Sequence, residues 1–451
     1  MAVAIEKSRL VSKIFFGVFW IAAVTPFFGQ EFLPSVYEKL SSPLFALIDL
    51  VLILLGAWVI RSKKDWFILL SLVLITFVST CILNDISILQ YINGMRLYIG
   101  FIFMIPIVRY FFAEPERKQQ FIEKFDKALY IFLWIQVPCM SYQCFLYGAF
   151  DKVGGSLGWM MSGVITTLIY LVSFYLMLRR WNKDKSYFQN LKDNWILVFL
   201  LFPSYLNETK VAFVFLAMYF FFLVPIDRKF IKRMVYVVPT IFIVLIGAGY
   251  VYLSFVDKNN ANIFSKETLE IYLTGDDELV ELVEYIMDNN IEEVDEVDFA
   301  RGLKFAVLPL ILKREPHATA FGYGVGMYKG GTMFEKSKFA KQYNWLLQGT
   351  IMQAFLFMIE LGWIGLGWYV LFWILNFRVQ NKEYRNKQLQ LYMLLTIFVI
   401  SIYSCNFIIV PFYMIFMFLT YYSCHWNENS QEEEVISESH ERLLPEESAG
   451  L

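Results

Sequence analysis

The chain has 451 residues, of which 58% are hydrophobic, 19% aromatic and only 18% charged, and its formal net charge is −2. A soluble domain averages about 45–50% apolar and about 25% charged residues, so this composition excludes an ordinary soluble protein. The near-neutral balance shows no basic stripe for nucleic acid, and the five Cys form no CxxC pair that would indicate a disulfide framework or a zinc site.

Long apolar runs recur along the chain, and about 20 such residues can cross the roughly 30 Å hydrocarbon layer as a helix. The first run follows Lys7, Arg9 and Lys13, and we expect it to be a retained span because no small-residue cleavage site follows it. The sequence predicts an all-α polytopic membrane protein with about twelve transmembrane helices. Their expected ranges are 12–29, 43–60, 66–83, 91–112, 128–149, 157–178, 194–206, 209–225, 234–256, 347–375, 389–404 and 407–424.

The basic residues indicate how these spans are oriented. Lys and Arg prefer cytoplasmic connectors. With a cytoplasmic N-terminus, every inward-facing connector is rich in them, whereas the short outer connectors hold only Lys39 and Lys152 apart from Arg96 and Lys210 at their edges. The basic connectors are 7–13, 61–64, 117–127, 179–192, 228–233 and 378–387. We therefore expect a multi-pass protein of the bacterial inner membrane with both termini in the cytoplasm.

One connector is much longer than the others and divides the chain into four parts. These are spans 1–9 (1–256), a large extracytoplasmic loop (257–346), spans 10–12 (347–426) and an acidic cytoplasmic tail (427–451) that we expect to be disordered. Loops of this length are usually functional or disordered. The loop begins with an acidic segment, 276–297, whose apolar spacing predicts an amphipathic helix with a solvated face, and continues with an apolar segment, 300–316, suited to the membrane surface.

Cations at the edges of spans are candidate functional residues, because charges within spans are costly. Arg96 lies just inside the fourth span, Lys210 begins the eighth, and Arg301 enters from the large loop, all on the outer side. Three converging cations would suit a diphosphate, since Arg offers planar paired donors and Lys a compact charge. Alternatively, they are separate cations reaching toward the interface, with Lys210 paired to Glu208.

Three alternating glycines follow the apolar loop segment in FGYGVG (321–326), just after His317. No strand and helix bracket them as a dinucleotide-binding loop would require. Glycine permits positive φ and close backbone approach. Gly322, Gly324 and Gly326 are therefore expected either to form a turn against a polar lipid-linked substrate, with Tyr323 near it, or simply to pack the loop onto the helices.

The order of these features resembles the O-antigen polymerase and O-antigen ligase superfamily over roughly residues 90–375. Arg301 precedes LKFAVLPLILKREP, then FGYGVG, then IELGWIGLG at 359–367. Upstream, VGGSLGWMMSG (153–163) is similar to the family's glycine-rich segment before a middle span, and NETKVAF (207–213) to its basic position after a short span.

The resemblance implies a GT-C-like membrane glycosyltransferase that needs neither a nucleotide sugar nor a metal. Polymerase members transfer a growing glycan from undecaprenyl diphosphate to a sugar hydroxyl of a new lipid-linked unit, sometimes with a chain-length regulator protein as a partner. Carried over to this chain, Arg301 and Lys210 would act on the donor diphosphate. Arg96, Lys304, Tyr323 and the three glycines would contribute to substrate binding.

The sequence departs from the ligase pattern at one place. Ligase members carry His-Asn shortly before the Glu-Leu-Gly span, but here that region, QYNWLLQGTIMQAFLFMIELG (342–362), has no histidine. His317, some thirty residues earlier, and Glu360 are the candidate general bases, although Glu360 could instead hydrogen-bond a neighbouring helix. Polymerase is thus the leading hypothesis, and a ligase or a transporter or flippase of lipid-linked sugars are the alternatives.

Overall fold

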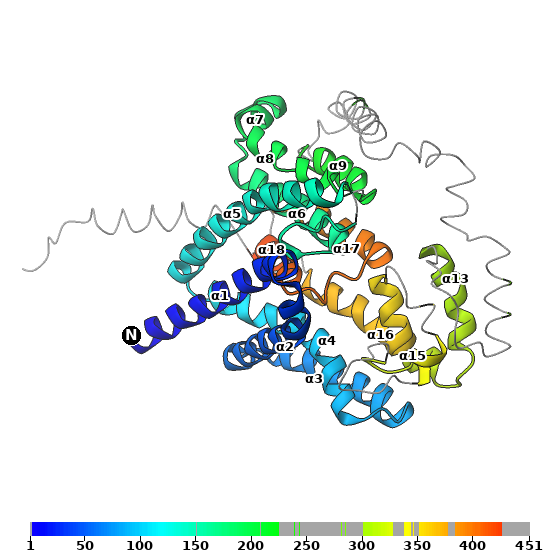
Figure 1. Cartoon of the computed structure of the whole chain (residues 1–451). Coiled ribbons are helices and arrows are strands. Elements are labelled where there is room, and N and C mark those ends of the chain that lie inside the picture. The colour runs from blue at the N-terminus through cyan, green and yellow to red at the C-terminus, as the bar shows by residue number, and fades with distance from the viewer. Residues whose placement is uncertain are drawn as a thin grey trace, which may run out of the picture.

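The computed structural model describes residues 2–149, 151–207, 209–224, 301–327, 338–343, 346, 351–377 and 384–425, with a few isolated positions, and these parts are helical (Figure 1). The first half contains α1 (Ala2–Phe32), α2 (Pro34–Val59), α3 (Lys63–Phe77), the π-helix η1 (Val78–Leu83), α4 (Ile88–Phe112), α5 (Pro115–Tyr147), η2 (Gly155–Leu157), α6 (Ser162–Arg180), α7 (Tyr187–Asp193), α8 (Trp195–Phe199), η3 (Phe202–Tyr205) and α9 (Val211–Phe222). The second half contains α13 (Arg301–Leu312), α14 (Ala318–Phe321), α15 (Lys338–Gln342), α16 (Gln353–Asn376), α17 (Tyr384–Tyr403) and α18 (Val410–His425).

Seven helices in the described ranges are long and apolar enough to cross a membrane, fewer than the twelve predicted. They are Lys7–Phe32, Pro34–Val59, Lys63–Leu83, Ile88–Phe112, Pro115–Tyr147, Ser162–Arg180 and Gln353–Asn376. The chain is therefore an α-helical membrane protein, and the count of twelve spans is not confirmed within the described residues.

The difference lies in the predicted spans that form shorter helices. The ranges 194–206 and 209–225 become α8 with η3, and the 12-residue α9. A 12-residue helix is roughly 18 Å long, less than a full crossing. The final two predicted spans form α17 and the 16-residue α18. Predicted span 234–256, the acidic helix 276–297 and the tail 427–451 lie outside the described residues, apart from isolated positions.

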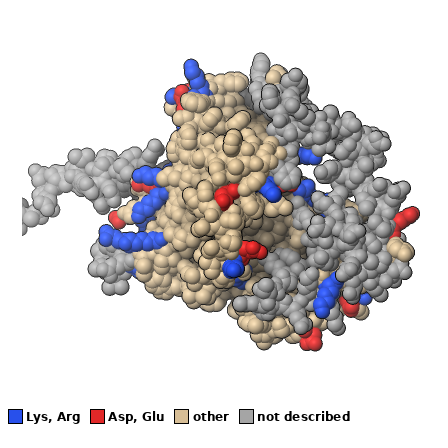
Figure 2. All heavy atoms as spheres, viewed as in Figure 1, with Lys and Arg blue, Asp and Glu red and all other residues tan. Residues whose placement is uncertain are grey.

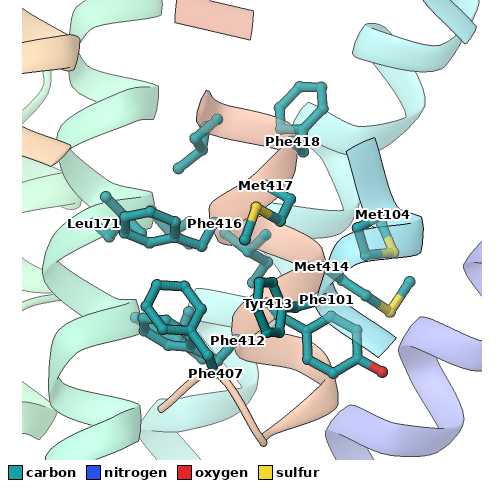
Figure 3. Close-up of a cluster of buried hydrophobic side chains, with 14 of the residues drawn as sticks. Phe101, Met104, Leu171, Phe407, Phe412, Tyr413, Met414, Phe416, Met417 and Phe418 are labelled. Carbon is teal, nitrogen blue, oxygen red and sulfur yellow. The ribbon is translucent and has the colours of Figure 1, made fainter. Parts of the chain in front are cut away.

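The centre of the bundle is α18. Every side chain from Val410 to Thr420 is buried, and so are those of α4 from Gly100 to Val108. Burial on every side places these two stretches inside the bundle and not at its lipid-facing edge. Figure 3 shows the aromatic and sulfur side chains that fill this centre, with Phe101, Phe407 and Phe412 clustered near the start of α18. The ring centroids of Phe101 and Phe407 lie 5.9 Å apart.

Ring contacts also fix the direction of the central helices. Phe101 lies by Phe407 just before α18, whereas Phe112 at the end of α4 lies 5.2 Å from Tyr421 at the end of α18. The two helices therefore run parallel. At the Tyr421 end, the cation of Lys7 lies over Trp58, and Lys64 Nζ donates to the carbonyl of Leu375 at 2.6 Å.

The basic residues Lys7 and Lys64 thus lie at one end of the bundle, because these contacts join the start of α1, the end of α2, the start of α3 and the end of α16. Figure 2 shows a largely uncharged face with a group of Lys and Arg near the N-terminal end of α1. The glycine-rich turn lies at the opposite end, since it contacts η1, where α3 finishes. Segregated charge of this kind is what the positive-inside pattern predicts for a membrane bundle.

Helix α16 is broken at Gly362, whose φ of 62° and ψ of −159° are not helical. A break leaves backbone carbonyls without their intrahelical partners, and within a membrane such groups must be satisfied by other protein groups. The carbonyls of Ile359 and Glu360 accept hydrogen bonds from the N–H groups of Tyr323 (2.8 Å) and Gly324 (2.9 Å). The loop segment that carries the glycines therefore completes the broken helix.

Candidate functional site

The glycine turn is a buried part of the bundle. Gly322, Gly324 and Gly326 have φ values of 69°, 91° and 74°, in the region that side chains disfavour. Gly326 also meets Gly94 of α4 backbone to backbone: a Cβ on Gly326 would lie 2.8 Å from the Cα of Gly94. The prediction of positive φ is confirmed. Of the two roles foreseen for the turn, packing onto the helices is the one these contacts describe.

Polar groups of η1 hold the turn from its other side. The N–H of Val325 donates to Thr80 Oγ1 at 2.9 Å, and Ser79 Oγ donates to the carbonyl of Phe321 at 2.5 Å. Asn84, just after η1, donates from Nδ2 to the carbonyl of Gly322 at 3.0 Å. A segment from the large loop is thus tied into the membrane-spanning part by hydrogen bonds from α3–η1 and α16.

Glu360 is 1% exposed and is bound by two donors. The N–H of Gly326 donates to its Oε1 at 2.9 Å, and the hydroxyl of Tyr98 in α4 donates to its Oε2. A buried carboxylate is stable only when it is hydrogen-bonded or paired. These contacts favour the second reading of Glu360, in which it joins a neighbouring helix.

His317 lies at the same end, half-buried, with Nε2 3.0 Å from Asn84 Oδ1. The orientation of the Asn84 amide is fixed, because its Nδ2 donates to two carbonyls, those of Ser79 (2.7 Å) and Gly322 (3.0 Å). Oδ1 is therefore the acceptor, and Nε2 of His317 must carry the proton. A neutral ring then has Nδ1 as its acceptor.

Arg301, the first residue of α13, packs against the end of α17. Its guanidinium lies 4.3 Å from the centroid of the Tyr403 ring, and its Nε donates to the Tyr403 carbonyl at 3.1 Å. The ring of Tyr403 in turn lies against Gly163 in the first turn of α6. Arg301 is therefore fixed at the α17–α18 connector, beside the start of α6.

Lys210 reaches the start of α6 from another direction. It immediately precedes α9, three residues after the fully buried Asn207. Asn207 Nδ2 donates to the carbonyl of Ser162 at 3.1 Å and to Thr166 Oγ1 at 2.9 Å. The first turn of α6 thus contacts the segments that carry both Arg301 and Lys210, and we call this region the α6 entrance (Ser162–Thr166, Asn207–Lys210, Arg301 and Tyr403–Asn406).

The α6 entrance contains a buried donor with no partner. Asn406, in the α17–α18 connector, is 0% exposed; its Oδ1 accepts from Ser404 Oγ at 2.6 Å. Its Nδ2 makes no hydrogen bond to any residue that the structure describes. Buried polar groups are nearly always satisfied, so this N–H is a candidate donor to a water or to a ligand oxygen.

Arg96 is paired with a carboxylate of α2. Its Nε lies 3.2 Å from Asp49 Oδ2 of α2, although the N–H does not point at an acceptor. Tyr413 of α18 donates to Asp49 Oδ1 at 3.3 Å. Arg96 is thus neutralised by a buried carboxylate, on the side of α4 away from Tyr98. Lys304, one turn into α13, is 0% exposed.

The structure therefore brings the segments that carry Arg301 and Lys210 to the first turn of α6, whereas His317 follows the far end of α13. Arg301 begins α13 and His317 follows its end, and 11 helical steps span roughly 17 Å. Sequence reasoning missed Asn84, Asn207 and Asn406. Each is an asparagine beside an apolar run, and a polar amide in such a position is the sequence pattern that could have identified them.

Comparison with known proteins adds no family to this geometry. No protein-family model matches the chain, and no curated protein matches it significantly. In the described ranges, no group of three or more His, Cys, Asp or Glu is placed to hold a metal ion.

Proposed function

We propose that this chain is a glycan polymerase of the bacterial inner membrane, of the GT-C-like kind that its motif order resembles. The observation that supports the proposal is the α6 entrance, where the segments that carry Arg301, Lys210 and Asn406 meet the first turn of α6 and where the Asn406 N–H has no partner among the described residues. Cations and a buried donor together suit an anion with several oxygens, such as the diphosphate of a polyprenyl carrier. Placed at the end of the bundle opposite the basic connectors, this region would face the outer leaflet.

The chemistry is a transfer of the growing glycan. A hydroxyl oxygen of a new lipid-linked unit attacks the anomeric carbon, the bond from that carbon to the diphosphate oxygen breaks, and its electron pair leaves with the diphosphate. The hydroxyl proton is lost to a base or to water. Arg301, Lys210 and Asn406 stabilise the charge that develops on the leaving group, which is the largest contribution such a site can make.

The test is a reconstitution of the full chain in lipid vesicles with lipid-linked repeat units. A ladder of lengthened glycans is expected, and Arg301→Ala, Lys210→Ala and Asn406→Leu should each shorten or abolish it. Lys185→Ala is the matched control, because Lys185 is an exposed cation at the basic end, paired with Asp193 at 2.6 Å. Equal ladders from all four variants would remove the α6 entrance as the reacting site.

A transporter or flippase is the second candidate, and the break in α16 favours it. Discontinuous helices beside buried ionisable groups are typical of substrate sites in secondary transporters, and Gly362 lies two residues from the buried Glu360. Movement of lipid-linked sugar across vesicles without any change in glycan length would select this function. A ligase would instead transfer glycan to a different acceptor, such as a lipid A core or a protein.

A further inference from the structure

A second polar site lies beside the glycine turn, away from the α6 entrance. It is a cleft of about 570 Å³ between the segment after η1 and the segment after α13, and His317, Asp85, Gln90, Arg314, Phe339 and Tyr343 are among its lining residues. Small-molecule sites usually measure about 300–1,000 Å³. None of these six residues belongs to the α6 entrance, so the proposed transfer step does not use the cleft.

Gln90 and His317 bring a donor and an acceptor to the lining of the cleft. Gln90 Nε2 is buried and makes no hydrogen bond to any described residue. The bond from His317 Nε2 to Asn84 leaves Nδ1 as the acceptor of the ring. A hydroxyl group both donates and accepts, so a ligand rich in hydroxyls suits such a lining, whereas an ionised phosphate oxygen only accepts.

The charges around His317 also disfavour an anionic ligand. Among the described residues that line the cleft, Asp85 and Glu315 bring two negative charges and Arg314 brings one positive charge. Burial raises the pKa of Tyr323 and of Tyr343, so both of these hydroxyls stay neutral. A diphosphate would therefore meet more repulsion than attraction in the cleft, whereas an uncharged sugar would not.

One wall of the cleft is aromatic. Phe339 lies between Tyr323 and Tyr343, with ring centroids 4.5 Å and 4.7 Å away. The hydroxyl of Tyr323 already donates to the carbonyl of Ile311 at 2.6 Å, so this residue offers mainly its ring. Aromatic faces beside hydrogen-bonding side chains match a ligand with apolar C–H faces and a rim of hydroxyls.

We propose that this cleft binds a sugar segment of the glycan at a distance from the reacting bond. This inference rests on the proposed function for the identity of the glycan. Helix α13, roughly 17 Å long from Arg301 to Leu312, separates Arg301 from the segment that carries His317, so a few sugar rings could lie between the diphosphate and the cleft. His317 is then a sugar-binding residue with a fixed tautomer, and the cleft determines how tightly the glycan is bound.

Binding can be measured without any transfer. The probe is the reducing oligosaccharide released by mild acid from the host's lipid-linked repeat units, titrated into the full chain in lipid nanodiscs. Gln90→Leu and His317→Gln should each weaken binding roughly tenfold, as expected for a lost hydrogen bond with a partner left unpaired. Gln119→Leu and His425→Gln are matched controls, because both residues lie at the basic end and outside the cleft.

A second readout tests the tautomer directly. The chain has three His, so ¹⁵N-histidine spectra of the wild type and His317→Gln assign the His317 signals. A protonated Nε2 and an unprotonated Nδ1 are expected, with the Nδ1 signal shifting when the oligosaccharide is added. Thermal unfolding of each variant identifies any that lost its fold.

The outcomes separate this proposal from the proposed function. Wild-type chain that fails to bind the oligosaccharide, or folded Gln90 and His317 variants that bind it as tightly as the controls, would overturn the cleft even if polymer is made. A proton on Nδ1 would overturn the hydroxyl pairing. Binding that depends on the cleft, in a protein that lengthens no glycan, would support the cleft and refute the polymerase.

Discussion

The backbone N–H of Gly326 donates a hydrogen bond of 2.9 Å to the carboxylate of Glu360, which joins the glycine turn to the broken helix α16. Tyr98 donates to the other oxygen of the same carboxylate, so α4 shares in this junction. One acidic side chain thus holds three segments that are far apart in the sequence. Its role in stability can be separated from a role in catalysis.

Replacing Glu360 by Ala should destabilise the protein strongly. The change leaves the Gly326 N–H and the Tyr98 hydroxyl buried without their acceptor, at a cost of about 1–3 kcal/mol for each group. Glu360→Gln keeps one carbonyl oxygen and should lose less. Thermal unfolding in detergent measures both. A Gln variant with full stability and no glycan-lengthening activity would show that the charge itself is used in the reaction.

The close contact between Gly326 and Gly94 makes a second prediction. Gly326→Ala places a Cβ against the Gly94 backbone and imposes positive φ on a residue with a side chain, which alone costs about 1–2 kcal/mol. The midpoint of thermal unfolding should fall. Gly367→Ala is the control, since nothing lies within 4 Å of a Cβ there. Equal midpoints for the two variants would mean that α4 and the turn are not in contact.

The sequence predicted the α-helical membrane class of the chain better than the arrangement of its helices. Apolar runs and basic connectors were sufficient for an α-helical membrane protein, because span length and charge are local properties. The short helices around Pro203 and Asn207 were missed, because hydropathy does not register that a proline and a buried amide interrupt a run. The break at Gly362 was missed because it depends on distant residues. The N–H groups that bind the carbonyls freed by the break lie about forty residues away, in the glycine turn.

The sequence could indicate which residues are candidates for the site, but not which side chains each of them contacts. The predicted topology placed Arg96, Lys210 and Arg301 on the outer side of the membrane. Whether each cation can bind a ligand depends on the side chains that it contacts in the fold. Asp49, 47 positions before Arg96, neutralises that cation, and no spacing in the sequence reveals such a pair. His317 was a candidate general base for the site of Arg301, whereas α13 separates Arg301 from the segment that carries His317.

The orientation of the bundle can be tested with cysteine labelling. Ser87 is exposed at the end that carries the glycine turn, and Lys185 is exposed at the basic end. In intact cells stripped of their outer membrane, a maleimide that cannot cross membranes should label Ser87→Cys. It should label Lys185→Cys only after permeabilisation. The reverse pattern would place the α6 entrance in the cytoplasm, where the outer-leaflet substrate cannot reach it.

The planar guanidinium of Arg301 is expected to matter beyond its charge. It stacks on Tyr403 and donates from Nε to the Tyr403 carbonyl, and the ammonium of Lys cannot do both. Arg301→Lys should therefore lower the rate of glycan lengthening about tenfold or more, equal to about 1.4 kcal/mol in the barrier. Comparison with Arg301→Ala shows how much a point charge recovers. A fully active Lys variant would show that charge alone suffices.

The pair formed by Arg96 and Asp49 separates a structural cation from one that binds substrate. Arg96→Leu alone leaves the buried carboxylate of Asp49 without its counter-charge, and breaking a buried pair in this way costs about 3–5 kcal/mol. Asp49→Leu alone should be similarly harmful. The double variant removes both charges, and its stability should return to near that of the wild type, because the two effects are coupled.

The activity of that double variant then decides the role of Arg96. If the pair only holds α2 to α4, the restored fold should lengthen glycan at the wild-type rate. If Arg96 leaves Asp49 to bind the donor diphosphate, the double variant should be stable but slow, with a raised KM for the lipid-linked unit. Unfolding midpoints and KM values for the four proteins of the cycle provide the measurement. A double variant as unstable as the single ones would refute the pairing itself.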